Sequence, residues 1–483
     1  MDKQNIKNVA KLIGATGAYL SLFFLIPIGV GLYYNEDIVP FLIFDIGFFL
    51  LNGAIFLSLK NHDVLLSLRD GILSVNLIWI LIGFAAAVPL WIYSDITPSQ
   101  ALFESISGFT TTGATIYADV ESLPNMILIL RSLTHWLGGM GILVLGVGLL
   151  SLINPSGSLT LFRAESSGIK LDKSAPKIKD TANMLWGIYI FLTASNFLLL
   201  MAGGMGAFDA INHAFSTIST GGFSTKNDSF ASFNTPFLLW ITTFFMIISG
   251  ITFLAHLKAF RGDFGGYKND ETKWYLIIFF LLCLIMSIAR FLSSDDSFFI
   301  AITHASFNIA SLMTTTGFAS QDYETWGQVA IAIAFLAMIA SGNGGSTSGG
   351  VKIIRYVVSM KVIFAELKKI LHPNAIIKVF VNSTHVSNSI VSMTFGFILL
   401  YVITNAAITF YLFASGYNMM TSLSAALACV GNIGPGFDRV GPVQNYSFFD
   451  GVDLIVLSIG MIMGRLEIFT FLLIFIPSFW RRF

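Results

Sequence analysis

Charged residues and cysteines are scarce in this chain. Only 11% of its 483 residues are Asp, Glu, Lys or Arg, whereas a soluble domain carries roughly 25%. The 27 basic and 27 acidic residues balance, which argues against nucleic acid as a partner. The two cysteines, Cys283 and Cys429, provide neither a metal-binding spacing nor a disulfide framework. The seven histidines are scattered without ligand spacing, so the sequence predicts no enzyme active site.

Hydrophobic residues dominate instead. They make up 55% of the chain, 46 of them are phenylalanine, and the mean hydropathy is +0.77. A membrane-spanning helix needs roughly 20 mostly apolar residues. The sequence therefore predicts an all-α membrane protein with ten transmembrane helices and with lipid around it. The ten segments are 12–33, 39–59, 72–93, 125–153, 182–206, 236–257, 274–293, 328–357 (interrupted), 388–414 and 452–476.

The distribution of lysine and arginine predicts the orientation of these spans, because cytoplasmic loops are enriched in both. With both termini in the cytoplasm, most basic residues fall on the inner side. These are the N-terminal lysines, Lys60, Arg69, the loops 154–180, 258–273 and 352–378, Arg481 and Arg482. Four remain for the outer side, namely Arg131, Lys226, Arg290 and Arg439. This bias predicts a multi-pass protein of a bacterial cytoplasmic (inner) membrane.

Four short glycine-centred loops interrupt the apolar runs, always on the predicted outer side. They read T-T-T-G-A-T at 110–115, S-T-G-G-F-S at 219–224, T-T-T-G-F-A at 314–319 and G-N-I-G-P-G at 431–436. Each follows a segment that is too short and too polar to cross the bilayer, which we interpret as a re-entrant half-helix. These segments are 97–110, 207–219, 298–313 and 418–430.

This recurrence predicts four helix–pore-loop–helix repeats with pseudo-fourfold arrangement around one pore. The repeats are 71–153, 181–260, 273–357 and 387–477, and an N-terminal two-helix hairpin lies within 1–70. Non-helical backbone at membrane depth is tolerated only where protein or water covers it. The alternative is that the loops are ordinary outer turns, in which glycine merely permits a positive φ.

Backbone carbonyl oxygens are the expected ligands in these loops. Rings of carbonyls replace the water shell of an alkali cation. The loops contain no ring of carboxylates, which disfavours a filter for divalent ions. The sequence therefore predicts a K⁺ filter. Its residues are Thr111, Thr112, Gly113, Thr220, Gly221, Gly222, Thr315, Thr316, Gly317, Asn432, Ile433 and Gly434.

A glycine-rich stretch within the interrupted span predicts a gate. Residues 342–350 contain Gly342, Gly344, Gly345, Gly349 and Gly350, so no stable helix continues through them. We interpret the stretch as an intramembrane loop below the filter; a cytoplasmic loop is the alternative.

Arg465 lies near the middle of the last span, where an arginine is costly unless it faces protein or water. We expect it to face the pore and to hydrogen-bond the carbonyls of 342–350. A structural ion pair is the alternative, although Glu467 should point to another helix face.

Three smaller features have structural interpretations. The segment W-L-G-G-M-G-I at 136–142 has the small-residue spacing of close helix packing. Glu104 and His135 are interpreted as satisfied polar groups near the first half-helix. His213 and His304 occupy similar contexts, D-A-I-N-H-A-F-S and I-T-H-A-S-F-N, and are expected to be equivalent.

The four loop repeats, G-N-G-G-S-T-S-G-G, the arginine of the fourth repeat and W-L-G-G-M-G together resemble the Trk/Ktr/HKT superfamily of potassium transporters. The additional N-terminal hairpin is similar to the bacterial TrkH/TrkG branch rather than to Ktr. The resemblance covers essentially the whole chain. It implies a homodimer with one pore per subunit, and a cytoplasmic ring of TrkA-like nucleotide-binding (RCK) subunits through which any nucleotide would act.

Within that resemblance, Asn432 and Ile433 depart from a Thr-Gly pattern in the fourth loop. Relatives that prefer Na⁺ often carry serine in place of the first filter glycine, so Gly113 favours K⁺. The expected function is potassium uptake through a gated, channel-like pore. The alternative is a proton- or sodium-coupled symporter. Such carriers usually have inverted repeats and midplane carboxylates, whereas these repeats run parallel and Glu467 is the only clear mid-span acid.

Overall fold

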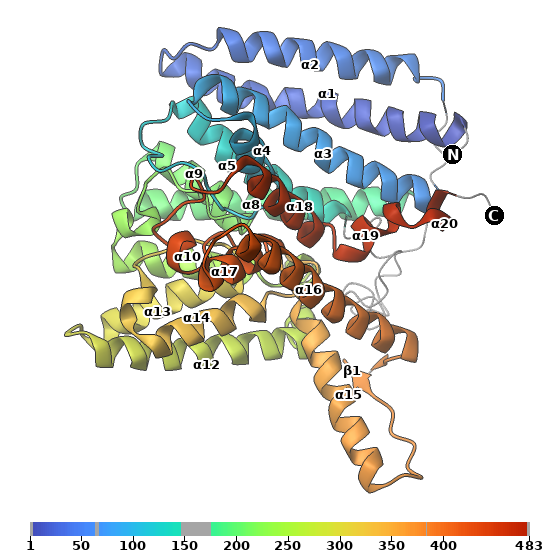
Figure 1. Cartoon of the computed structure of the whole chain (residues 1–483), viewed down its shortest axis with the longest axis vertical. Helices are drawn as coiled ribbons and strands as arrows, with labels where there is room; N and C mark the ends of the chain where they lie inside the picture. The colour runs from blue at the N-terminus through green and yellow to red at the C-terminus, as the bar shows by residue number, and fades with distance from the viewer. Residues whose placement is uncertain (1–2, 63–66, 146–174, 383, 481–483) are drawn as a thin grey trace.

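The computed structural model describes the chain except for residues 1–2, 63–66, 146–174, 383 and 481–483. The described part is a bundle of helices, with one short hairpin of two strands (Figure 1). The predicted repeat boundaries at 71–153 and the inner loop at 154–180 fall partly outside the described residues. The helices are α1 (Lys3–Tyr33), α2 (Val39–Ser58), α3 (Leu68–Tyr93), α4 (Pro98–Phe109), α5 (Asn125–Leu145), α8 (Ala175–Ala202), α9 (Ala207–Ile218), α10 (Pro236–Ser249), α11 (Phe253–Phe260), α12 (Asp270–Ser293), α13 (Phe298–Met313), α14 (Gln328–Ala340), α15 (Ile353–Leu371), α16 (Asn388–Ala414), α17 (Met419–Val430), α18 (Gly451–Arg465), α19 (Ile468–Leu472) and α20 (Pro477–Trp480).

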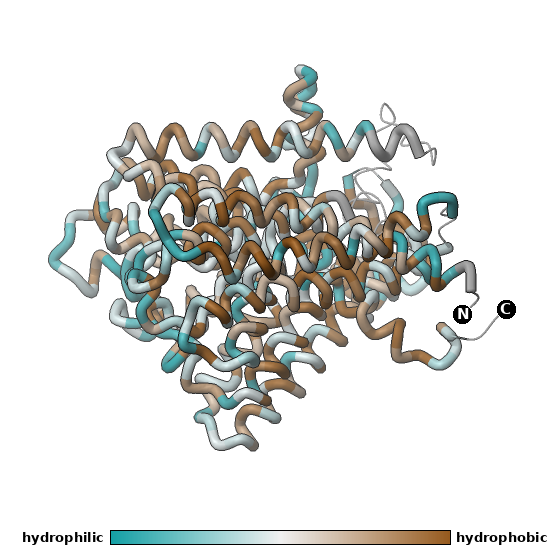
Figure 2. Tube along the Cα trace, turned by 90° about the horizontal axis from the view of Figure 1, so that it is seen from above, coloured by the Kyte–Doolittle hydropathy of each residue, from teal (hydrophilic) through white to brown (hydrophobic). Residues whose placement is uncertain are grey.

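Among the described residues, seven helices are long and apolar enough to cross a membrane, and up to nine spans result if two bent pairs each count as one. Hydrophobic residues dominate the central part of the bundle, and hydrophilic residues gather in loops and at helix ends (Figure 2). Much of this apolar surface is exposed. In α2, for example, only 17% of the apolar stretch is buried. An exposed apolar surface of this extent is suited to contact with lipid. The predicted helical membrane fold is therefore confirmed, whereas the count of ten spans is not.

Two segments predicted to be continuous spans are bent. The segment 236–257 divides into α10 and α11, which meet at 97°, and 452–476 divides into α18 and α19, which meet at 115°. At the first bend, the freed carbonyl of Gly250 accepts a hydrogen bond from Asn343 N at 2.8 Å. At the second bend, Glu467 has a positive φ of 57°. Apolar periodicity predicts helix but does not register a partner that stabilises a break.

The four re-entrant segments are present as the short helices α4, α9, α13 and α17. Three begin with a side chain that accepts a hydrogen bond from the first turn, at Thr97, Ser297 and Asn418. Such caps satisfy the unpaired N–H groups of a helix start. Each short helix then runs into one of the four glycine loops.

The inner loop predicted over 352–378 is mostly helix. The helix α15 continues to Leu371 and extends beyond the bundle, and strands β1 (Phe380–Val381) and β2 (Thr384–His385) follow it as an antiparallel hairpin (Figure 1). The start of α1 and the helix α20 lie on the same side of the bundle (Figure 1).

The N-terminal hairpin α1–α2 packs on the rest of the bundle at both ends. At one end, Glu36 accepts hydrogen bonds from the backbone N–H groups of Asn125 and Met126, at 2.6 and 2.9 Å. At the other end, Asn8 Nδ2 donates to Asp70 Oδ2 at 3.2 Å. Glu467 was predicted to be the only clear acid within a span, which is wrong: Asp45 lies within α2 and is 3% exposed.

Candidate functional site

All four half-helices end in the same backbone turn. The residue two positions before each loop glycine is left-handed, with φ between 52° and 59°: Thr111, Thr220, Thr315 and Asn432. The next residue donates its N–H to a carbonyl five positions earlier. The four bonds, 2.7–2.9 Å long, are Thr112 to Ser107, Gly221 to Ser216, Thr316 to Ser311 and Ile433 to Ala428. This is the Schellman pattern of helix ends, here repeated four times.

Three of these left-handed residues are threonines, for which positive φ is a genuine outlier. Residues held in such conformations cost about 1–3 kcal/mol each and persist only where the surroundings impose them. A left-handed residue is usual at such a helix end, but glycine or asparagine is the common choice there, so threonine in three of the four loops is unusual. It indicates that the direction of the backbone groups in these loops matters.

The four loops contact one another in a closed ring. The glycines Gly113, Gly222, Gly317 and Gly434 have φ between 81° and 95°, and each packs against the loop of the next repeat. A Cβ added at each would lie 2.2 Å from Gly221 O, 1.9 Å from Thr316 O, 2.3 Å from Ile433 O and 2.6 Å from Thr112 O, respectively. The contacts thus run from repeat 1 to 2, 3 and 4 and back to 1.

Carbonyl oxygens therefore occupy equivalent places in all four loops. A ring of this kind can replace the water shell of an alkali cation. The four half-helices also bring the negative ends of their dipoles to the loops that form the ring. Both features favour a cation.

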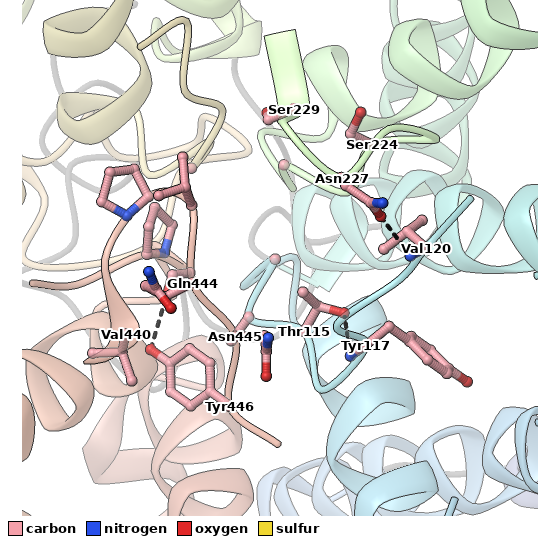
Figure 3. A pocket seen from close by; sticks show the side chains of 18 of the residues that line it. Thr115, Tyr117, Val120, Ser224, Asn227, Ser229, Val440, Gln444, Asn445 and Tyr446 are labelled. Carbon is pink, nitrogen blue, oxygen red and sulfur yellow. Dashed lines mark hydrogen bonds between the residues drawn. The ribbon is translucent and has the colours of Figure 1, made fainter. Parts of the chain in front are cut away.

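A cavity of about 90 Å³ lies against this ring, and all four loop glycines line it. Its wall also contains Thr115, Ser224, Asn227, Gln444 and Tyr446 (Figure 3). Asn227 Oδ1 accepts a hydrogen bond from Val120 N at 2.6 Å, which joins the loops that follow the first and second glycines (Figure 3). The lining contains two cationic residues, Arg131 and Lys226, and each has a carboxylate partner.

A side chain from each half-helix contacts the chain just beyond its glycine. Three of the four accept a hydrogen bond from a backbone N–H, whereas His213 contacts a serine side chain. Nine positions before the glycine are Glu104, His213 and Asn308; in the fourth repeat, Ser424 performs this role from ten positions before. Their contacts are Glu104 to Ile116 N at 2.9 Å, His213 to Ser224 Oγ at 2.9 Å, Asn308 to Ser320 N at 3.1 Å and Ser424 to Phe437 N at 3.0 Å.

The expected equivalence of His213 and His304 is therefore wrong. His304 also contacts a loop residue, since its Nδ1 lies 2.9 Å from Ser320 Oγ, but it sits one helical turn earlier than Asn308. The similar residues around the two histidines suggested the wrong register between the second and third repeats. Counting back from the loop glycines would have identified Glu104, His213 and Asn308 as a set.

Glu104 and Arg131 form a buried ion pair behind the first two loops. Arg131 Nε donates to Glu104 Oε1 at 2.8 Å, and their side chains are 2% and 0% exposed. Arg131 Nη1 also donates to Ser224 O at 3.2 Å, and the guanidinium lies 4.1 Å from the centre of the Phe223 ring. One ion pair therefore connects the loops of repeats 1 and 2.

The glycine-rich stretch 342–350 lies directly below the ring. Gly349 N donates to Thr315 Oγ1 at 2.7 Å, and Thr347 Oγ1 donates to Ile218 O at 3.0 Å. A Cβ at Gly349 would lie 2.5 Å from Gly431 O. The stretch thus contacts the ends of the second, third and fourth half-helices.

Arg465 contacts the same stretch. Its Nη1 donates to Thr347 O at 2.8 Å, and its Nη2 lies 3.4 Å from Gly138 O. Arg465 is the last residue of α18, because the chain bends after it. Glu467 consequently does not follow the helix face that the sequence predicted, and it pairs with Arg355 at 2.7 Å.

Glycines in 136–142 permit close packing, as the sequence indicated. A Cβ at Gly138 would lie 1.8 Å from Phe109 O, at the end of the first half-helix, and one at Gly139 would lie 2.8 Å from Ser219 Cβ. Gly464 has the same relation to Val430 O, at 2.0 Å. The half-helix ends therefore rest on backbone rather than on side chains.

Apolar helices around a closed ring of four backbone loops define a class: integral membrane proteins in which a central ring of carbonyl oxygens can accommodate a cation. The family model TrkH, a cation transport protein, matches residues 40–271 and 293–482. The chain belongs to this family, and the resemblance found from the sequence is confirmed.

Individual relatives agree over the whole length. The Trk system potassium uptake protein TrkH of Halomonas elongata is 33% identical over 484 residues, covering 99% of this chain and 100% of that protein. The Trk system potassium uptake protein TrkG of Escherichia coli strain K12 is 32% identical and covers 100% of both chains. The crystal structure of the potassium transporter TrkH from Vibrio parahaemolyticus matches with a TM-score of 0.89 and 32% identity, covering 99% of this chain and 100% of that one.

Proposed function

We propose that this chain mediates potassium uptake across a bacterial cytoplasmic membrane, through a channel-like pore along the axis of the four loops. The observation that carries the proposal is the closed ring, in which each loop glycine packs against the carbonyl of the next repeat. The relatives named as potassium uptake proteins support K⁺ as the transported ion. The chain is accordingly a transporter and not an enzyme.

The filter of the proposal comprises the loop residues predicted from the sequence. Neutral carbonyls suit a monovalent cation, and the described cavity against the ring has no Asp or Glu in its lining. The left-handed threonines and Asn432 orient these carbonyls. Ile433 contributes a carbonyl like the others, so its departure from a Thr-Gly pattern changes the side chain but not the ring.

The gate of the proposal is the stretch 342–350 together with Arg465. The contacts to three half-helix ends and to Arg465 support an obstruction directly beneath the filter. The arginine would also repel a cation at this level. For the pore to open, the stretch must break its contact with Thr315, and Thr347 must break its contact with Arg465.

The proposed architecture comprises ten spans, two in the N-terminal hairpin and two in each of the four repeats, with both termini in the cytoplasm. It counts α14, the glycine-rich stretch and the start of α15 as one broken span, in addition to the two bent pairs. We further propose a homodimer, with one pore per subunit, and a cytoplasmic TrkA-like nucleotide-binding ring. The helix α15 extends from the bundle, where such a ring can reach it (Figure 1).

Single-channel recording of the purified protein in a bilayer, with opposed K⁺ and Na⁺ gradients, tests the proposal. Discrete unitary currents that reverse near the K⁺ equilibrium potential are expected. A flux that requires a proton or sodium gradient, without unitary currents, would favour the coupled symporter instead.

A further inference from the structure

The first turn of α12 joins the glycine-rich stretch to the projecting helix α15. Three consecutive residues in this turn, Asp270, Glu271 and Thr272, contact different parts of the chain. Asn269 caps the turn, since its side chain accepts a hydrogen bond from Thr272 N at 2.7 Å. The turn is therefore a fixed platform on which the three side chains are held relative to one another.

Glu271 and Thr272 hold the glycine-rich stretch. Glu271 is 3% exposed, and its Oε1 accepts a hydrogen bond from Gly344 N at 2.7 Å. Thr272 Oγ1 accepts one from Asn343 Nδ2 at 2.8 Å. Loss of either acceptor would leave a buried donor without its hydrogen bond, which is costly, so Glu271 and Thr272 anchor this end of the stretch.

Asp270 holds the cytoplasmic elements. Its carboxylate accepts a hydrogen bond from Asn382 N at 3.1 Å and pairs with Lys361 of α15. Asp270 N in turn donates to Asn382 Oδ1 at 2.6 Å. Lys361 Nζ also donates to Phe380 O at 2.9 Å, so α15, the turn beside β1 and the start of α12 form one connected unit.

From these contacts we infer that Asp270 and Glu271 are positioning residues that couple α15 and its hairpin to the obstructing stretch. Displacement of α15 or the hairpin moves Asp270, and the same helical turn then withdraws Glu271 from Gly344. The inference rests on the proposed gate, and it assigns that gate a mechanical link to the cytoplasmic surface. Arg465 holds the opposite part of the stretch, at Thr347, so the stretch is anchored from two sides.

The test uses the full-length protein with Cys283 and Cys429 replaced by alanine and Ser346→Cys introduced into the stretch. Ser346 is 3% exposed, so slow modification by a thiol reagent from the cytoplasmic side is expected in this parent. Glu271→Ala should accelerate modification and raise K⁺ flux per folded molecule by about tenfold, the scale of one lost buried hydrogen bond. Glu271→Gln retains an acceptor for Gly344 N and should change both readouts much less.

Three further variants keep the test independent of folding. Thr272→Val preserves shape but removes the acceptor for Asn343, and should accelerate modification by a few fold. Glu366→Gln removes an exposed acid of α15 that pairs with Lys369, and should change neither readout. Asp270→Ala should accelerate modification alone but add little to Glu271→Ala, because both changes act on one connection.

The possible outcomes separate the coupling from the gate. Acceleration in Glu271→Ala and Thr272→Val, without additivity for Asp270→Ala, supports the coupling. If Arg465→Ala raises flux but Glu271→Ala and Thr272→Val leave modification and flux unchanged, the coupling is wrong and the gate stands. If Arg465→Ala also has no effect on either readout, the proposed gate itself is overturned.

Discussion

Arg355 at the start of α15 and Glu467 after the end of α18 form an ion pair, with Nη2 and Oε2 2.7 Å apart. The Arg355 side chain is fully buried, and its guanidinium lies 3.7 Å from the centre of the Phe397 ring. The pair thus joins the breaks of two different spans, each of which would be costly to expose to lipid.

Glu467→Gln should destabilise the protein by about 3 kcal/mol, because it leaves a buried arginine without its counter-charge. The expected result is a lower midpoint of thermal unfolding in detergent. Glu366→Gln, which removes an exposed ion pair with Lys369, should cost less than about 1 kcal/mol. Equal midpoints for the two variants would contradict a structural role for Glu467.

Gly113→Ser should reduce discrimination of K⁺ from Na⁺ without preventing membrane insertion. Its Cβ would meet Gly221 O at 2.2 Å, so the first two loops must move apart. The measurement is the ratio of K⁺ to Na⁺ flux in proteoliposomes. Gly416→Ser is a matched control, since Gly416 also has a positive φ, of 99°, but open space around a Cβ. If both variants, or neither, change the ratio, this loop is not part of the filter.

Arg465→Ala should raise K⁺ flux and partly free it from regulation, and shortening 342–350 should do the same. Because both changes remove one barrier, the double variant should exceed the single ones only slightly. Flux is measured per folded molecule. Additive effects, or a lower flux in Arg465→Ala, would show that the arginine serves packing and not gating.

Glu104→Gln should weaken ion discrimination and stability together. It leaves the buried Arg131 without a charged partner, at a cost of about 3 kcal/mol, and loosens the link to Ser224 O. His213→Asn places in the second repeat the residue that the third repeat uses at the equivalent position, and should be tolerated. Flux ratios and unfolding midpoints for both variants provide the check; greater damage from His213→Asn would contradict the equivalence.

Acid should loosen the fourth half-helix from outside the spans. Asp438 accepts hydrogen bonds from Thr421 Oγ1 and Asn418 Nδ2, both at 2.6 Å, and these lower the pKa of its carboxyl. Nearby Arg439 acts in the same direction. Because the folded pKa is depressed, the stabilisation is complete above about pH 5 and is lost as the pH falls below about 4.

In Asp438→Asn, the midpoint of thermal unfolding should therefore depend less on pH in that acidic range. Glu324 lies beside Asp438, and burial raises the pKa of its carboxyl, so Glu324→Gln serves as the control with the opposite sign. An unchanged profile in Asp438→Asn would place the acid sensitivity elsewhere.

The sequence predicted the half-helices well because their signals are local. A cap such as Asn418, an apolar run too short to span and a glycine at the end suffice for α17. The loop residues followed from the same pattern. The bond from Arg465 to a carbonyl of 342–350 was also expected, and the structure has it at Thr347. In contrast, the partner of Glu467 depends on where α18 ends, and hydrophobic periodicity continues through that break.

Contacts between repeats were the second kind of information that the sequence lacked. Glu104 and Arg131 are 27 positions apart, and nothing in their local context links Arg131 to Ser224 of the next repeat. Likewise, Glu271 follows a polar turn and reads as an ordinary acid of a helix start. Its burial against Gly344 arises only when distant breaks in the chain meet.

The ring of loops is encoded by one continuous chain rather than by four identical subunits. In a tetramer of identical subunits, a single codon change alters four positions at once, whereas here it alters one quarter of the ring. Glu104, His213, Asn308 and Ser424 show the result, since four different side chains contact the chain just beyond the glycine of their own repeats. A single substitution therefore changes one quarter of this ring and leaves the sequence of the other three loops as it was.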